Sequence, residues 1–354
     1  MTPKVTVLTC VYNGLPYLKD AIDSTLNQTY SDFEYLIIDD ASPDPNVCKL
    51  IESYSDSRIK FIKNEKNLGV SDTFNKALSL IKTKYTVRLD QDDVNLPNRI
   101  EEQISYLENN PSIDIVCSWE HTIDSNGKKI KSWKRVFDNY GDFLGYVLIG
   151  ICPIWHPSIA FKSNIMVEAG GFNKNYTRAE DFEVTARLAI LRYGAAIVPK
   201  FHLLQREHNS SQSSEFAVAQ AEVCRRIHAE TITNFIKYSN QELLANFLTF
   251  KLKENKIKIS KDNLIEIHAA MNELFTNINT KQNLTNSELQ SIKRLVYRRV
   301  GYGVFAAPII TKLPSILFYL AYYILSPFQL NNLRILASKA YHSLLKIRHL
   351  FKIN

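Results

Sequence analysis

The sequence predicts an α/β protein whose N-terminal part is a mostly parallel sheet with helices on both faces. Strand-like apolar runs alternate with helical patterns through about residue 100. Two of these runs end in clustered aspartates, and ligands of open α/β sheets bind at that edge. An apolar content of 45% in 354 residues is enough for a large buried core.

The first elements are recognised by apolar runs and by apolar positions repeated every three or four residues. They are a strand at 4–10, a helix at 17–28, strands at 33–40 and 58–64, a helix at 71–81 and a strand at 84–90. Asn13 and Gly14 mark the turn after the first strand. Ser71 or Asp72 is expected to cap the second helix.

The following elements continue this order with longer connections. A helix is expected at 98–110, then a strand at 113–124 and a hairpin turn at 125–128. Residues 150–212 are expected to be loop-rich, apart from a helix at 179–194. Beyond residue 213 the pattern is mostly helical. We therefore predict a catalytic domain at 1–215, a helical region at 216–297 and a separate tail at 298–354.

The charge is unevenly distributed along the chain. The net charge is +7, and residues 289–354 hold ten Lys or Arg and no acid, which leaves −3 for residues 1–288. A basic tail predicts a local anionic partner. The five cysteines are odd in number and show no CxxC spacing, which favours a reducing compartment without structural zinc.

Three carboxylates fall within four positions of the segment "VRLDQDDVNLPNRI". Asp90 and Asp92 are two residues apart and can converge on one hard cation, Mg²⁺ or Mn²⁺, that also binds phosphate oxygens. The alternative is a solvated turn with an aspartate cap before the next helix. The triplet alone does not decide between them.

Six short segments in a fixed order are more specific than the aspartate triplet alone. The third string below holds two of them, the D-x-D and the P-x-R. "VTVLTCVYNGLPYLKDAIDSTLNQTYSDFEYLIIDDASPD", "NEKNLGVSDTFNKAL", "VRLDQDDVNLPNRI", "HPSIAFKSNIMVEAGGF" and "AEDFEVTARL" contain them. Together they resemble family 2 glycosyltransferases of the GT-A fold, over about 60% of the chain. The resemblance implies a Rossmann-like nucleotide-binding mixed sheet flanked by helices, followed here by an unmatched, mostly helical region.

The resemblance also implies roles on the nucleotide side. Asp40 would accept the imide N–H of a uracil, and Asp39 would shape the turn. Asp90 would lie near the ribose and the ion, and Asp92 would be the direct metal ligand. The residues expected to bind the nucleotide sugar are Cys10, Tyr12, Asp40, Asn67, Arg88, Asp90 and His208.

Two roles on the nucleotide side stay open. Arg88 would meet phosphate or only balance the acids as a salt bridge. Asp93 would cap or support the loop.

On the acceptor side, Asp181 resembles the family's catalytic base and Glu180 a contact to the acceptor hydroxyl. Arg187 matches the arginine six residues further on. A base opposite the leaving group implies inversion, so an α-linked nucleotide sugar would yield a β-glycoside. The alternative for both acids is a helix N-terminus that favours negative charge.

Three further side chains would either contact a ligand or have only a structural role. His156 and His208 are both expected in loops, with a surface histidine as the plain interpretation of each. The resemblance implies that His208 would contact the diphosphate or metal. Trp155 would stack on a sugar ring or pack as a core indole. The chain has no Q-x-x-R-W segment, which favours a single transfer per encounter.

The tail predicts a membrane-surface segment. Residues 313–328 are apolar and free of charge, too short for a straight span, with basic residues on both sides. Residues 333–351 form an apolar stripe, which is typical of a helix lying in the lipid interface. We expect a peripheral or monotopic protein on the cytoplasmic face of the inner or plasma membrane. A packed subdomain or a dimer interface remains the alternative, and nucleic acid is not expected.

The expected function is an inverting, metal-dependent transfer of a hexose or N-acetylhexosamine from a UDP-sugar. The acceptor would be a hydroxyl of a polyprenyl-diphosphate-linked glycan in cell-surface polysaccharide synthesis. Two alternatives are a polyprenyl-phosphate glycosyltransferase, which needs no base, and a non-catalytic nucleotide- or carbohydrate-binding scaffold.

Overall fold

The computed structural model describes residues 3–208, 217–236 and 261–306. In these residues the chain forms nine strands of one sheet. They are β1 (Val5–Val11), β2 (Phe33–Asp39), β3 (Ile59–Lys63), β4 (Tyr85–Arg88), β5 (Val94–Asn95), β6 (Ile115–Ile123), β7 (Lys129–Trp133), β8 (Ala160–Lys162) and β9 (Ala195–Arg206). The strand order is β3-β2-β1-β4-β8-β6-β9-β5, and β7 pairs with β6 outside this path.

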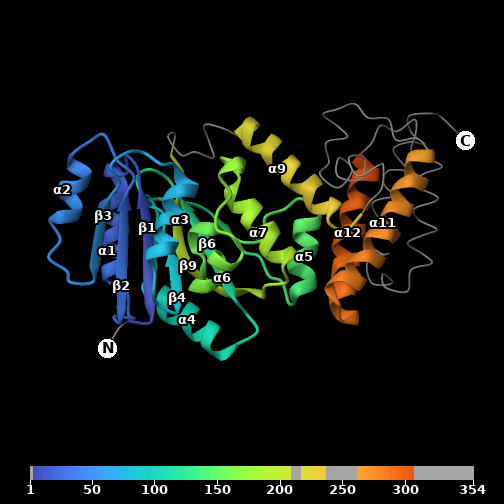
Figure 1. Cartoon of the computed structure of the whole chain (residues 1–354), viewed down its shortest axis with the longest axis horizontal. Helices are drawn as coiled ribbons and strands as arrows, with labels where there is room; N and C mark the ends of the chain where they lie inside the picture. Colours follow the sequence, from blue (N-terminus) through green and yellow to red (C-terminus); the bar gives the residue numbers. More distant parts are fainter. Residues whose placement is uncertain (1–2, 209–216, 237–260, 307–354) are drawn as a thin grey trace, which may run out of the picture.

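The helices cover the sheet and continue beyond it (Figure 1). Those that follow the strands are α1 (Leu15–Leu26), α2 (Asn46–Glu52), α3 (Val70–Leu80), α4 (Arg99–Asn109), α5 (Tyr140–Leu148), α6 (Ser163–Glu168) and α7 (Glu180–Ile190). Two short 3-10 turns are η1 (His156–Ser158) and η2 (Lys174–Tyr176). The C-terminal region adds α9 (Ala217–Thr233), α11 (Lys261–Gln282) and α12 (Asn286–Ala306).

The predicted parallel pairing holds for the N-terminal strands. β1 pairs in parallel with β2 and β4, and β2 pairs in parallel with β3. β8 runs antiparallel to both β4 and β6, so the sheet as a whole is mixed. The carboxyl ends of β1, β2 and β4 lie at one edge, where Asp40 N–H donates to Val11 O at 2.8 Å. The aspartates that follow β2 and β4 therefore meet there, as the sequence predicts.

One long strand was missed in the segment expected to be loop-rich. β9 has twelve residues and pairs with β6 in parallel, but its register shifts on either side of Trp119. Pro199 and Lys200 lie at this irregularity and are exposed. Proline cannot donate to a ladder and marks bulges, so its presence obscured the strand in the sequence.

The expected cap of α3 is also wrong. The helix begins at Val70 with Gly69 as its N-cap, so Ser71 and Asp72 lie within the first turn. Gly69 has φ 83° and ψ 166°, a conformation open essentially to glycine alone. The Gly69 N–H donates to a carboxylate oxygen of Asp40, directly after β2, and to the amide oxygen of Asn67 in the same loop, and these two contacts fix the turn.

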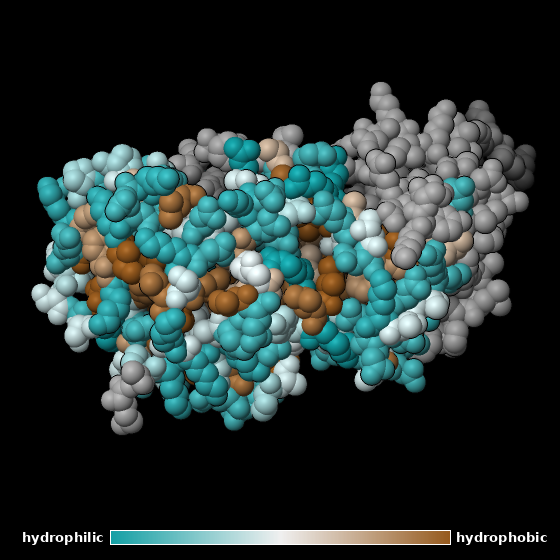
Figure 2. Space-filling model, in the orientation of Figure 1, coloured by the Kyte–Doolittle hydropathy of each residue, from teal (hydrophilic) through white to brown (hydrophobic). Residues whose placement is uncertain are grey.

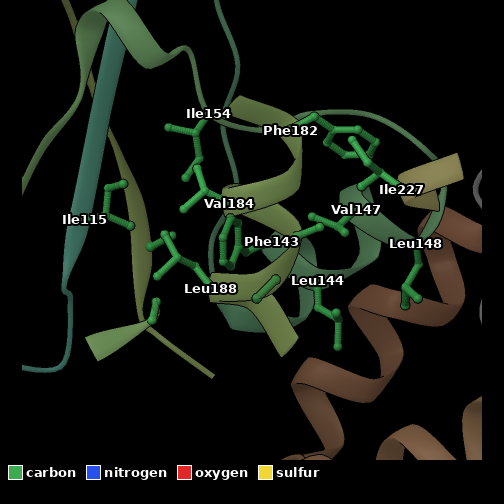
Figure 3. Close-up of a cluster of buried hydrophobic side chains, with 14 of the residues drawn as sticks. Ile115, Phe143, Leu144, Val147, Leu148, Ile154, Phe182, Val184, Leu188 and Ile227 are labelled. Carbon is green, nitrogen blue, oxygen red and sulfur yellow. The ribbon is translucent and has the colours of Figure 1, made fainter. Parts of the chain in front are cut away.

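The core has one large cluster that joins the sheet to the later helices. Figure 3 shows Phe143 and Val147 of α5 beside Val184 and Leu188 of α7, with Ile115 of β6 near them. The helical region is packed onto this cluster through α5. A Cβ on Gly141 would meet the backbone of Glu288 at 2.1 Å, so the glycine lets α12 approach closely.

The sequence expectations for the far C-terminus fall outside the described residues. The apolar and amphipathic segments at 313–328 and 333–351 belong to this undescribed part. Among the described helices, none combines the length and apolarity needed to cross a membrane. On the face drawn in Figure 2, hydrophobic residues gather along the middle, between hydrophilic borders.

Candidate active site

Asp40 anchors the loop that leads into α3. Its side chain is buried, and Oδ1 accepts hydrogen bonds from Asn64 Nδ2 at 2.7 Å and from the Leu68 N–H at 2.9 Å. Oδ2 accepts the Gly69 N–H at 2.9 Å. A carboxylate offers about four acceptor positions, so a position on Oδ2 is left for a ligand. Asp40 therefore holds the loop before α3 through hydrogen bonds, and the binding of a base by Asp40 stays a prediction.

The other residues predicted on the nucleotide side surround the same edge. Asn67 Oδ1 accepts the Gly69 N–H at 2.9 Å, so this side chain shapes the loop. Tyr12 is 44% exposed after β1, in a position open to a ligand. Burial raises the pKa of the Cys10 thiol, so Cys10 is a neutral group there.

Asp39 shapes the turn, in agreement with its sequence interpretation. The side chain is fully buried and its Oδ1 accepts the Ser42 N–H at 3.0 Å. Cys48 Sγ lies 3.4 Å from Oδ2. These contacts leave Asp40, rather than Asp39, at the ligand-facing edge.

Arg88 lies between Asp90 of the acid loop and His156. Its Nε donates to Asp90 Oδ1 at 2.9 Å, and its Nη1 lies 3.2 Å from His156 Nδ1. The guanidinium also lies 4.3 Å from the ring centroid of Phe74. The salt bridge that the sequence left as an alternative is therefore present, and contact of Arg88 with a phosphate stays a prediction.

Asp92 and Asp93 differ in what they face. Asp92 Oδ2 lies 2.9 Å from His208 Nε2, and burial together with the neighbouring Asp90 raises the pKa of Asp92. Asp93 is 2% exposed and accepts the Arg206 N–H at 2.8 Å. Burial and then the charges of Asp92 and Asp90 raise the pKa of Asp93 well above its ordinary value. Asp93 supports the loop, and Asp92 faces His208.

Gln91, between the two acids, was not recognised in the sequence. Its Oε1 accepts the Tyr12 N–H at 2.7 Å and its Nε2 donates to Tyr12 O at 3.0 Å. This double contact ties the acid loop to the turn after β1. A Cβ on Gly14 would lie 2.7 Å from the same Oε1, which explains a glycine at that turn. A glutamine between two aspartates was the available signal.

The acids fit a hard divalent cation as a partial ligand set. Asp90 and Asp92 supply carboxylate oxygens, which Mg²⁺ and Mn²⁺ prefer, and a nucleotide diphosphate would supply the remaining oxygens. Within residues 3–208, 217–236 and 261–306, no three His, Cys, Asp or Glu side chains form a ready-made metal site. A cation here would thus depend on the phosphate oxygens of its ligand.

Glu180 and Asp181 begin α7, as the sequence predicts. Asp181 Oδ1 accepts the Phe182 N–H at 2.7 Å. Burial raises the pKa of both acids above their ordinary values, and in each case the nearby Arg88 opposes the rise. Arg187 does not contact Asp181. It pairs with Glu183 at 2.7 Å and donates to Gly171 O at 2.6 Å, so it holds the loop before the helix.

The surface interpretation of the two histidines is wrong. His156 is 3% exposed, and its Nε2 lies 3.0 Å from Thr185 Oγ1. Burial, and then Arg88, lower the pKa of His156 well below its ordinary value, so it is neutral. His208 is partly buried against Asp92. His156 therefore joins the Arg88 side to α7, whose Thr185 donates to Asp181 O at 2.8 Å.

A buried polar network beneath the acid loop was also missed. Arg99 is fully buried, and its Nη2 donates to Arg88 O at 2.6 Å and to Ile159 O at 3.2 Å. Burial lowers the pKa of Arg99 to about 9. Gln103 extends the network to Ser158 O at 2.7 Å. The P-x-R spacing in the sequence was the signal, although the targets of Arg99 are distant in the chain.

The sequence of this chain is similar to known glycosyltransferases. The family model "Glycosyl transferase family 2" matches residues 6–163. An uncharacterized glycosyltransferase of Methanocaldococcus jannaschii, MJ1057, is 35% identical over 210 residues, covering 58% of this chain and 72% of that protein. The chain belongs to glycosyltransferase family 2.

The chain is also similar in sequence to an O-antigen glycosyltransferase and in fold to a solved structure. The O-antigen biosynthesis glycosyltransferase WbnJ of Escherichia coli is 31% identical over 191 residues, covering 52% of this chain and 71% of WbnJ. The crystal structure of S. aureus TarS 1-349 in complex with UDP-GlcNAc superposes with a TM-score of 0.56 at 16% identity. It covers 84% of this chain and 89% of that one, which confirms the GT-A fold for the transferase.

Proposed function

We propose that the transferase moves a hexose or N-acetylhexosamine from a UDP-sugar to a hydroxyl of a lipid-linked glycan, with inversion at the anomeric carbon. The observation that carries this proposal is the bridge formed by Arg88 and His156. Arg88 pairs with Asp90 after β4, and His156 connects Arg88 to Thr185 of α7, which donates to the Asp181 backbone oxygen. These contacts support a leaving-group site and a candidate base that belong to one network of side chains.

The nucleotide side is built to hold a constant group. Asp40 and Asn67 hold the loop before α3, Tyr12 is exposed beside it, and Arg88 supplies a cation. TarS binds UDP-GlcNAc in a chain of this fold, which supports a UDP-sugar here.

Asp181 is proposed as the general base. Burial raises the pKa of its carboxyl, and Oδ1 accepts the Phe182 N–H at 2.7 Å, which fixes the carboxyl at the start of α7. A positioned base contributes roughly 10²–10⁴ to the rate. Glu180 would orient the same acceptor. Proton removal from one face, with the leaving group on the other, requires an inverted product.

Asp90 and Asp92 would hold the divalent cation, with His208 placed against Asp92. Bound there, Mg²⁺ or Mn²⁺ would supply Lewis-acid stabilisation of the charge on the departing diphosphate. Arg88 contributes a fixed positive charge to the same place, 2.9 Å from Asp90. This charge is present before the substrate arrives and costs no reorganisation.

The biological setting is proposed from relatives and from the sequence of the tail. WbnJ is named for O-antigen biosynthesis, which supports assembly of a cell-surface glycan. The basic, apolar C-terminus supports peripheral or monotopic binding at the cytoplasmic face of an anionic membrane. A polyprenyl-phosphate acceptor is already ionised and needs no base, so the buried Asp181 argues against that alternative. The retained acids also argue against a scaffold without activity.

The proposal is tested with a panel of UDP-sugars and diphosphate-linked glycan acceptors, each with and without EDTA. We expect transfer from one α-linked donor, loss of transfer with EDTA, recovery with Mn²⁺ or Mg²⁺, and a β-linked product by NMR. An α-linked product would remove the single-base mechanism. Transfer that is indifferent to EDTA would remove the metal.

A further inference from the structure

The edge strand β7 carries an aromatic and cationic surface that the proposed chemistry does not use. Between residues 128 and 135 the chain has five basic side chains and no acidic one. Trp133 is 44% exposed in this segment. We define the β7 patch as Lys131, Trp133, Arg135 and Trp155.

The patch has the geometry of a stacking site. The ring centroids of Trp133 and Trp155 are 6.4 Å apart and their planes are inclined by 44°. Arg135 lies 4.5 Å from the ring centroid of Trp155. Lys131 lies 5.2 Å from that of Trp133 and also forms an exposed ion pair with Glu207 at 2.6 Å, which an incoming diphosphate would replace. Two indoles offer apolar faces to a sugar ring, and each has a cation beside it.

A chain of side-chain and backbone contacts connects the patch to the proposed base. Arg135 donates to Cys152 O, and Cys152 Sγ lies 3.7 Å from Thr185 Oγ1. Thr185 in turn donates to the backbone oxygen of Asp181. Trp155 directly precedes His156, which contacts the same Thr185. The patch therefore borders the acceptor side of the site.

Glu120 lies under the patch and is unusual. It pairs with Trp133 across the β6–β7 ladder, so both side chains are on the same face of the sheet. Both of its oxygens are buried and have no hydrogen-bond partner. Burial raises the pKa of Glu120 to about 7, so near neutral pH it sets only a partial charge against an incoming anion.

We propose that the β7 patch is the acceptor subsite that binds the sugar carrying the diphosphate of a lipid-linked acceptor. The sugar ring stacks on Trp133 and Trp155, and the diphosphate meets Arg135 and Lys131. This inference rests on the proposed function and adds to it the part of the acceptor that the protein recognises.

Two other interpretations of the patch fit less well. One interpretation is that the lysines of this edge strand prevent its pairing with another chain. An exposed tryptophan does not help to prevent such pairing. A membrane-binding hairpin would insert its tip, and the tip at residues 125–128 is Ser-Asn-Gly-Lys. An anionic sugar conjugate uses both the rings and the cations.

The test uses intrinsic tryptophan emission of the full-length protein. The chain has three tryptophans, and the third, Trp119, donates to Arg135 O at 2.9 Å, so emission reports on this region alone. The probes are octyl diphosphate esters of GlcNAc, GalNAc, galactose and rhamnose, beside the matching uncharged octyl glycosides. We expect at least one diphosphate ester to change the emission at concentrations roughly tenfold or more below its glycoside.

Variants of exposed residues test the assignment. Trp133→Ala and Lys131→Gln should each raise the acceptor KM roughly tenfold. They should leave kcat and the slow hydrolysis of the UDP-sugar without acceptor unchanged. Lys49→Gln, an exposed lysine on the distant α2, is the matched control and should change nothing.

Three results would overturn the inference. They are emission that responds to no diphosphate ester, an acceptor KM that both variants leave unchanged, or Trp133-dependent sedimentation with anionic vesicles without any binding of the esters. Failure of the proposed function looks different, because UDP-sugar hydrolysis would then be absent while ester binding by the patch would persist.

Discussion

The nucleotide side and the acceptor side hold their carboxylates in different ways. Asp40 accepts three hydrogen bonds of 2.7–2.9 Å, two of them from backbone N–H groups of one loop. Asp181 accepts the Phe182 N–H, and burial raises its pKa. The first carboxylate is held by three hydrogen-bond donors, whereas burial makes the second more basic.

This contrast matches the two proposed tasks, nucleotide binding by Asp40 and proton removal by Asp181. A nucleotide presents the same groups in every turnover, so a carboxylate held in place by donors of one loop can bind it without taking part in proton transfer. An acceptor hydroxyl has to lose a proton, and a buried carboxylate with few donors is better matched to that task. The measurements below change one side at a time.

Apart from the base itself, the largest effect is expected at the cation. Asp92→Asn should lower kcat by roughly 10²–10³, because a carboxylate ligand and its charge are lost where the diphosphate departs. The control is the neighbouring Asp93→Asn, which keeps an oxygen for the Arg206 N–H and removes a charge that burial already disfavours. Turnover is measured with saturating donor across a range of Mn²⁺ concentrations. Equal losses in both variants would contradict the division of roles within the loop.

A smaller effect is expected on the nucleotide side. Asp40→Asn places an amide N–H₂ against loop donors, and an unsatisfied buried donor costs about 1–3 kcal/mol. The affinity for UDP should fall about tenfold or more, with kcat at saturating donor within a few-fold of wild type. Calorimetric titration of UDP and steady-state kinetics check this. A loss confined to kcat would mean that Asp40 acts in the chemical step and that the comparison is wrong.

The smallest effect concerns stability. The pKa of Glu120 rises from 4.5 to about 7 in the folded protein, so the folded chain binds more protons than the unfolded chain in that interval. The free energy of unfolding should therefore fall as the pH rises from about 4.5 to 7. Glu120→Gln should remove roughly 1–3 kcal/mol of this fall, measured by urea unfolding at pH 5 and pH 7.5. Parallel pH dependence in both proteins would show that Glu120 does not titrate there.

The sequence predicted the parts of the molecule that have a local signature. The acids after β2 and β4, the hairpin at 125–128 and the start of α7 with Glu180 and Asp181 all appear where expected. β9 was missed because Pro199 interrupts its pattern, and the α3 cap was misplaced because Gly69 needs a conformation that only its tertiary contacts explain.

Contacts across the fold could not be predicted from one chain. The hydrogen bonds of Asp40 span 24 to 29 residues, the Gln91–Tyr12 pair spans 79, and the His208–Asp92 pair spans 116. Periodicity places each of these side chains on an element but does not state which elements meet. The burial of His156 between Arg88 and Thr185 has the same origin.

The most direct test of the central claim compares turnover and UDP affinity in Asp181→Asn. The account predicts that kcat falls by roughly 10²–10⁴, while the Kd for UDP stays within about twofold of wild type, because the nucleotide side is untouched. Turnover near the wild-type level would contradict Asp181 as the base, and so would a loss of UDP binding that accounts for the lost activity.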